Sequence, residues 1–303
     1  MTTLIRSELQ RAWSRRLMRV FVLLALAAVA LTGALSFATS SSGNGAAIDA
    51  KVHAARDAQR AADAAYLKCL YAQSQVPTHA GSVNCPEPTR HRVHDPRFYQ
   101  QKIKNYVTGG AGIAALIAWV MGASLVGAEF ASRGMTTSLT FSPTRWKLFA
   151  AKALAAVTTT TVWAAATLGA LWLALLPALA FHGGPNLLQP SNLSIAGTLL
   201  RGIGLVAATT LIGFALASFG RGTAAALGMG FGYVIVLENI LGSALAGWRP
   251  WLLLGNIIAF LTGNPANAGI VGRSVLGAGV FLACVAGGLV LTSGATFMRR
   301  DVA

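Results

Sequence analysis

The sequence contains a long stretch without a charged residue. No Asp, Glu, Lys or Arg occurs between Lys152 and Arg201. A water-exposed surface could hardly tolerate such a stretch, whereas a helix that crosses the hydrocarbon core of a bilayer needs ~20 consecutive apolar residues. The charge-poor stretches 20–47 and 274–298 also meet this requirement. The chain is therefore expected to be a membrane protein.

Composition supports this expectation. Hydrophobic residues make up 54% of the chain and charged residues only 11%. The 33 glycines are typical of helices that pack closely in lipid. The net charge of +15 would favour a nucleic-acid partner if it formed one basic patch, but the basic residues lie mostly near the ends of apolar stretches. We predict a single transmembrane domain over 1–303 and no nucleic-acid partner.

The hydrophobic pattern predicts an all-α polytopic membrane protein with six transmembrane helices. Five arginines lie within residues 1–19, around the start of the first span, which marks the cytoplasmic side. A cleaved signal peptide is the alternative for this segment, but its apolar run is longer than a signal peptide requires. The predicted spans are 17–37, 107–128, 153–181, 195–219, 224–245 and 275–297.

The distribution of basic residues predicts that both termini are cytoplasmic. With this orientation the cytoplasmic segments carry 12 Lys and Arg, whereas the two short outer loops carry only Arg249 and Arg273. The outer loop at 40–106 carries nine, but loops longer than ~60 residues do not report orientation. Abundant Ala, and Arg in preference to Lys, are typical of a GC-rich bacterium. We therefore expect a multi-pass protein of a bacterial cell membrane.

Residues 1–16 are expected to form an interfacial helix on the inner leaflet. Trp13 lies at the predicted water boundary. The alternative is a frayed tail whose arginines only orient the first span. The apolar residues Leu4, Ile5, Leu9 and Trp13 share one face, and Arg6, Gln10 and Arg11 lie on another.

The insertion at 40–106 is predicted to be a small extracytoplasmic helical domain. Its Ala-rich part, 48–73, has helical composition, and prolines follow. Cys69 and Cys85 lie in this exported loop, where oxidising conditions favour a disulfide, while Cys284 is alone in the last span. The alternative is a metal site that adds His91 and His94, although the close cysteine pair usual for zinc is missing.

The region 246–274 is predicted to contain a re-entrant segment before the last span. Trp248 and Trp251 precede the apolar stretch 252–261, which is too short to cross a membrane. The alternative is a short helix on the outer surface, anchored by these two tryptophans.

Two charged residues fall inside the predicted spans. Arg201 and Glu238 lie at similar depths, since each residue of a helix adds 1.5 Å along the axis. Charges in a membrane usually face a partner or an aqueous cavity. We expect an ion pair or a lining of the outer cavity, in preference to a proton relay.

Sequence motifs for enzyme chemistry are missing. The chain has no H-E-x-x-H and no G-x-S-x-G motif, and the dipeptide Gly-Lys never occurs. A phosphate loop of the G-x-x-x-x-G-K-[ST] kind is therefore excluded. We expect a transport subunit that has no catalytic site, metal or cofactor of its own.

The segment between the second and third spans resembles the intracellular segment of ABC type-2 permeases. Members of this family show a Glu after the second span, then Gly, Leu, Pro and Arg, and a Lys that opens the third span. The stretch that carries the resemblance contains Gly127, Ala128, Glu129, Phe130, Arg133, Gly134, Thr136, Leu139, Ser142, Pro143, Thr144, Arg145, Lys147 and Lys152, while Met135 stands where the family often has Thr.

This resemblance implies a permease subunit of an ABC transporter, an exporter, that forms the substrate path. Segment 129–148 would be the cytoplasmic coupling segment that docks on a separate ATPase subunit, which binds ATP and Mg. Its contact residues would be Glu129, Arg133, Gly134, Pro143, Arg145 and Lys147. A second permease chain, identical or related, and membrane lipid would complete the assembly.

Two other functions compete with this reading. One is an ATP-independent secondary transporter or channel, in which segment 129–148 would be an ordinary positive-inside loop. Such a protein is expected to have polar residues near the middle of the membrane and internal repeats, which the sequence scarcely offers. The other is an integral membrane enzyme, for which the spans supply no candidate nucleophile or metal ligand.

Overall fold

The structure is a computed structural model that describes residues 2–41, 45–74, 85, 97–132, 134–135, 144–183, 192–241, 246–270 and 273–299. These residues are almost entirely helical, and within them the only β-type pairing is a bridge between Phe98 and Gly183. The chain forms two compact units. The first contains 1–34, 100–175 and 188–303, and the second contains 35–99 and 176–187.

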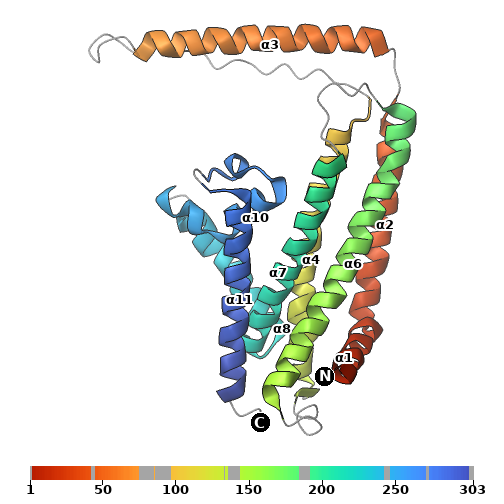
Figure 1. Cartoon of the computed structure of the whole chain (residues 1–303), viewed down its shortest axis with the longest axis vertical. Coiled ribbons are helices and arrows are strands. Elements are labelled where there is room, and N and C mark those ends of the chain that lie inside the picture. Colours follow the sequence, from red (N-terminus) through yellow and green to blue (C-terminus); the bar gives the residue numbers. More distant parts are fainter. Residues whose placement is uncertain are drawn as a thin grey trace. The chain divides into compact units, whose positions relative to one another are not determined.

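The six predicted spans are confirmed as helices that are long and apolar enough to cross a membrane. In Figure 1 the long helices of the first unit run in broadly similar directions. These helices are α2 (Arg16–Thr39), α4 (Gln100–Ala131), α6 (Arg145–His182), α7 (Asn192–Gly220), a fifth helix over Thr223–Ile240, and α11 (Val275–Arg299).

The helix pair α4 and α7 forms the centre of the first unit. The two backbones approach so closely that a side chain at Gly122 would overlap the carbonyl oxygen of Thr210. A side chain at Gly213 would overlap the carbonyl oxygen of Trp119 in the same way. Small residues at such crossings allow the close packing on which helix association in lipid depends.

Two apolar clusters surround this helix pair. One joins α2, α4, α6, α7 and α11 through residues such as Met18, Trp163 and Leu205. The other joins α4, α6, α7 and α11 around Phe149, Phe214 and Phe297. Met135, which follows the second span, is buried in the second cluster.

The fifth span differs from the regular helix that the sequence predicts. It begins as α8 (Thr223–Gly232) and continues as a π-helix, η1 (Tyr233–Leu241). A π-helix hydrogen-bonds residues five apart, so Tyr233 and Glu238 lie on one side of it. Both side chains accept hydrogen bonds from the following helix, which favours the wider winding.

The predicted re-entrant region contains three short helical segments. They are η2 (Ala246–Trp251), α10 (Leu253–Thr262) and η3 (Pro265–Ala268). Arg273 Nη1 donates 2.7 Å hydrogen bonds to the oxygens of Pro250 and Asn256, which join the ends of this region. The expected apolar stretch is therefore a helix, while its entry into a membrane stays a prediction.

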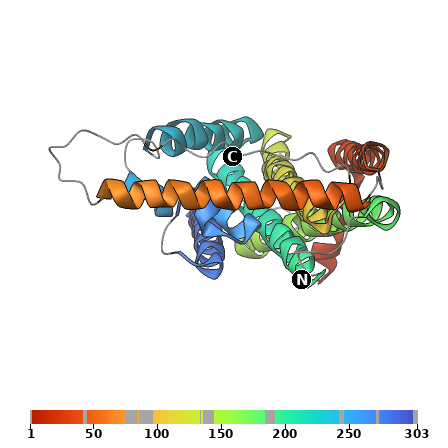
Figure 2. The same ribbon diagram turned by 90° about the horizontal axis from the view of Figure 1, so that it is seen from above.

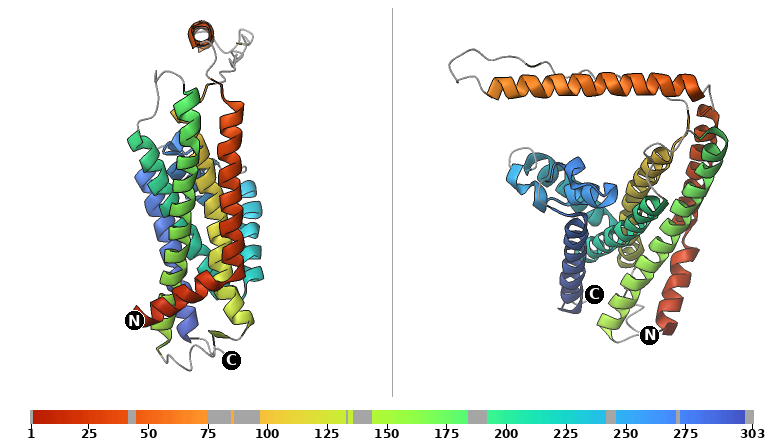
Figure 3. Two further views of the ribbon diagram at one scale, coloured as in Figure 1. Left: turned by 90° about the vertical axis from the view of Figure 1, so that its right-hand side faces the viewer. Right: turned by 45° about the horizontal axis from the view of Figure 1, so that its top comes forward.

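The N-terminal segment is the helix α1 (Thr2–Ser14), as expected. It ends in a bend at Arg15, and α2 follows at an angle (Figure 3). Its position at the inner leaflet remains a prediction.

The second unit contains α3 (Gly45–Ser74), a straight helix within the predicted insertion (Figure 2). Arg97 Nη2 lies 2.7 Å from Asp49 Oδ1 near the start of this helix. The backbone N–H of Phe98 donates to the carbonyl of His182, and Phe37 stacks against the His182 ring. The first of these two contacts joins the insertion near Phe98 to the end of α6, and the second joins the end of α2 to the end of α6.

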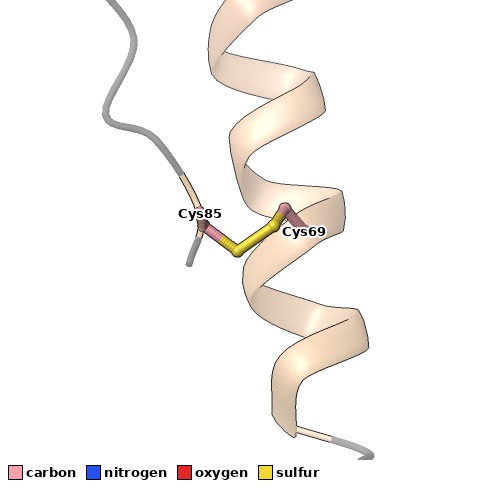
Figure 4. The surroundings of a disulfide bond; sticks show 2 residues. All are labelled: Cys69 and Cys85. Atoms are coloured by element: carbon pink, nitrogen blue, oxygen red, sulfur yellow. A yellow bond between two sulfur atoms is a disulfide. The ribbon is translucent and has the colours of Figure 1, made fainter. Parts of the chain in front are cut away.

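Cys69 and Cys85 are joined by a disulfide, with their Cα atoms 5.9 Å apart (Figure 4). The bridge fixes residue 85 against α3. Cys284 is a free, exposed thiol in α11.

Digestion of the protein without reductant is expected to release the peptides of Cys69 and Cys85 as one linked species. A bridge that closes a loop of this size stabilises the folded unit by about 3 kcal/mol, so Cys69→Ser should make the insertion more sensitive to protease. Cys284→Ser is the matched control and should change neither property. Recovery of both loop cysteines as free thiols from membranes would contradict the bridge.

Candidate functional site

Four charged side chains from distant parts of the sequence meet in the first unit. Glu8 lies on α1, Arg15 at the bend after α1, Glu129 near the end of α4, and Lys152 in the second turn of α6. We call Glu8, Arg15, Glu129 and Lys152 the four-charge cluster. A small cavity beside it is lined by these residues and by Arg11, Ala12, Leu125, Val126, Ala155 and Ala156.

Lys152 is the centre of the cluster. Its Nζ donates to Glu8 Oε1 at 3.1 Å and lies 2.6 Å from Glu129 Oε2, an ion pair without hydrogen-bond angles. Arg15 binds the other oxygen of Glu129, with Nη2 3.1 Å from Oε1. Its Nη1 also donates to the carbonyl of Ser124. The cluster thus links α1, α4 and α6.

Three of the four side chains are shielded from solvent, while Arg15 is 28% exposed. The side chain of Lys152 is 4% exposed, that of Glu8 is 7% exposed and that of Glu129 is 13% exposed. Two carboxylates and two cations balance in charge, so their burial is tolerated only while all partners remain. Arg11, 3.6 Å from Glu8, lies exposed at the rim.

Local sequence explains how the charges reach this position. Glu8 and Ala12 are one turn apart on α1, and both are buried. Lys152 is followed one turn later by Ala155 and Ala156, whose small side chains leave room for the carboxylates.

The structure separates the predicted coupling residues into two groups. Glu129 points into the four-charge cluster, where its carboxylate contacts Lys152 and Arg15. Lys147 is exposed at the start of α6, and Arg145 Nη1 donates to the carbonyl of Met298 at 3.5 Å. Gly134 is half-buried beside Met135. Arg133 and Pro143 lie outside the described residues.

The predicted ion pair between Arg201 and Glu238 is not formed. The Glu238 carboxylate accepts a 2.6 Å hydrogen bond from the backbone N–H of Leu254, in the first turn of α10. The Arg201 guanidinium lies against Gly263, the residue that caps the other end of α10. Each charge therefore lies at an end of a ten-residue helix, about 15 Å long, that separates them.

The helix dipole explains this arrangement. The N-terminus of a helix carries about half a positive charge and the C-terminus about half a negative charge. The negative Glu238 therefore lies at the positive N-terminus of α10, and the positive Arg201 lies at its negative C-terminus. The similar depth of the two residues stays a prediction, and depth alone does not show what lies between them.

The described residues contain no group of three or more His, Cys, Asp or Glu side chains that could hold a metal ion. His91 and His94, which the alternative metal site would require, lie outside those residues.

The fold and the buried charge cluster define a multi-pass helical membrane protein. A family model described as "ABC-2 family transporter protein" matches residues 3–262. The chain belongs to this family, which confirms the resemblance seen in segment 127–152. It is thus the membrane-spanning permease component of an ABC transporter, a system that includes an ATPase partner. No curated protein matches the sequence.

Proposed function

We propose that the chain is the permease subunit of an ABC exporter in a bacterial cell membrane, with both termini in the cytoplasm. Two copies, or this chain and a relative, form the substrate path. A separate ATPase subunit binds ATP and Mg and hydrolyses ATP, and the chain itself is not an enzyme. The ATPase docks on segment 129–148.

The four-charge cluster is the observation that carries this proposal. The docking segment, 129–148, begins at Glu129 near the end of α4 and ends in the first turns of α6, just before Lys152. The ion pair between Glu129 and Lys152 therefore joins the two helices that flank the segment. A push on the segment would move α4 and α6 together, and α1 would follow through Glu8. A buried, fully paired cluster resists separation of these helices, which suits the transmission of force.

The cluster also divides the roles within the segment. Glu129 is a positioning residue, because its carboxylate is occupied by Lys152 and Arg15. Lys147 is exposed and offers its charge to an acidic group on the ATPase. Met135, buried in the apolar core, anchors the part of the segment next to Gly134.

Reversal of the charge at Lys147 tests docking without disturbing the cluster. Lys147→Glu is expected to weaken binding of the ATPase about tenfold and to lower ATP hydrolysis by the assembled transporter, because like charges at an interface repel. Copurification and ATPase rate in lipid nanodiscs would measure both effects. Arg56→Glu, on an exposed position of α3, is the matched control.

Normal assembly and ATP hydrolysis with Lys147→Glu would contradict the docking site. Transport that continues after removal of the ATPase would favour the ATP-independent transporter or channel. Both readouts require that the variant reaches the membrane in normal amounts.

A further inference from the structure

We propose that Arg201, with Thr198 and Gly263, forms a binding site for an oxyanion group beside the C-terminal end of α10. The ligand is the phosphate of an anionic membrane lipid or the acidic group of a free amphiphile. This site involves none of the four-charge cluster and does not depend on the proposed docking of the ATPase.

The guanidinium of Arg201 has hydrogen-bonding capacity left over. It carries five N–H donors. Nη2 donates to Thr198 Oγ1 at 3.1 Å, while Nε is buried and has no acceptor among the described residues. Buried polar groups are normally paired, so an unpaired donor on a charged group indicates a missing partner.

Carboxylates that could neutralise Arg201 are already engaged elsewhere. Glu238 is the only acidic residue of the sequence between positions 130 and 300, and it caps the far end of α10. Glu8 and Glu129 are bound within the four-charge cluster. The C-terminus of α10 supplies only about half a negative charge. Arg201 therefore retains a net positive charge inside an apolar helix.

The guanidinium can lie directly against the C-terminal end of α10 because residue 263 is glycine. A Cβ at this position would lie 2.8 Å from Nη1 and 2.9 Å from Nη2. Gly263 has a φ of 70°, a backbone angle that residues other than glycine rarely adopt. Thr198, fully buried, holds the guanidinium from the other side.

The surroundings of α10 attract anions. Besides Arg201, Arg249 lies near Gly269, and Arg273 binds Asn256 in the middle of α10. Three guanidinium groups thus lie around α10, whereas Glu238 at its N-terminus is the one carboxylate that contacts this helix among the described residues. A guanidinium binds phosphate or carboxylate with two parallel hydrogen bonds, which matches the donors that Arg201 leaves open.

The depth of the site suits a ligand that enters from the bilayer. Arg201 lies nine residues, or about 13 Å along the axis, from the start of α7 at Asn192. A long arginine side chain extends from such a position towards the lipid headgroups. The acyl chains of an amphiphile would then lie along the apolar helices.

Native mass spectrometry of the full-length chain in dodecyl maltoside tests the site. Wild-type protein is expected to bind phosphatidylglycerol or dodecyl phosphate at least tenfold more tightly than Arg201→Gln does. Preference for phosphatidylglycerol identifies a lipid phosphate, and equal or tighter binding of dodecyl phosphate identifies a free amphiphile. Arg299→Gln, exposed at the end of α11, is the control and should bind both like wild type.

Arg201→Lys keeps the charge but not the paired donors, so it tests the site if Arg201→Gln fails to fold. It should reach the membrane normally and bind the same two probes several-fold more weakly. Equal binding of both probes to wild type and Arg201→Lys, or to wild type and a folded Arg201→Gln, would overturn the proposal.

Discussion

Replacement of Lys152 by methionine is expected to destabilise the protein more than any other single loss of charge considered above. Methionine has a similar length and no charge, so the change removes the cation between the carboxylates of Glu8 and Glu129. Removal of one partner from a buried ion pair costs about 3–5 kcal/mol. The monodisperse fraction in detergent and the melting temperature should both fall, whereas Lys147→Met, on the exposed face of α6, should change neither.

A second substitution makes this prediction specific. In Lys152→Met the Glu8 carboxylate has no buried cation, but Glu129 still binds Arg15. Addition of Glu8→Gln should therefore recover much of the lost stability, so the two changes should not be additive. A stable Lys152→Met protein, or an additive loss in the double variant, would show that solvent already screens the cluster.

The spans could be predicted from the sequence because the bilayer sets a minimum apolar length that few other folds require. Their ends could not be predicted as well. The helices α4 and α6 begin at Gln100 and Arg145, before the apolar residues start. A helix that leaves the hydrocarbon continues without the apolar signal, because water and headgroups accept its polar side chains.

The site was only partly visible in the sequence. Glu129 was singled out by its place in the family pattern, but its partner Lys152 was taken only as the residue that opens the third span. Glu8, which lies 144 residues from Lys152, was missed. One signal was present, because Glu8 is a lone acid among five arginines. Which cation such an acid meets depends on helix packing, which the sequence pattern does not give.

The predicted ion pair between Arg201 and Glu238 is not formed for a similar reason, because helix packing decides which groups meet. Sequence spacing gives the depth of a residue in a helix, but not the direction in which its side chain points. Here the intervening helix α10 satisfies both charges in part through its dipole, and the π-helical turn at Tyr233 directs Glu238 towards Leu254. A sequence pattern based on regular α-helices could not show either feature.

Introduction of a methyl group at Gly122 is expected to disrupt the central helix pair. The new Cβ of Gly122→Ala would overlap the backbone oxygen of Thr210, and a backbone atom cannot move aside as the end of a flexible side chain can. The helices α4 and α7 would have to separate, which weakens the contacts on which association in lipid depends. Overpacking of this kind costs about 1–3 kcal/mol.

Gly109→Ala is the matched control on the same helix, because no atom lies within 4 Å of the position that its Cβ would occupy. It should leave the melting temperature unchanged or raise it, since alanine favours the helix. Gly213→Ala makes the reciprocal change on α7 against Trp119 and should lower the melting temperature as Gly122→Ala does. Equal melting temperatures for Gly109→Ala and Gly122→Ala would mean that α4 and α7 do not meet at this crossing.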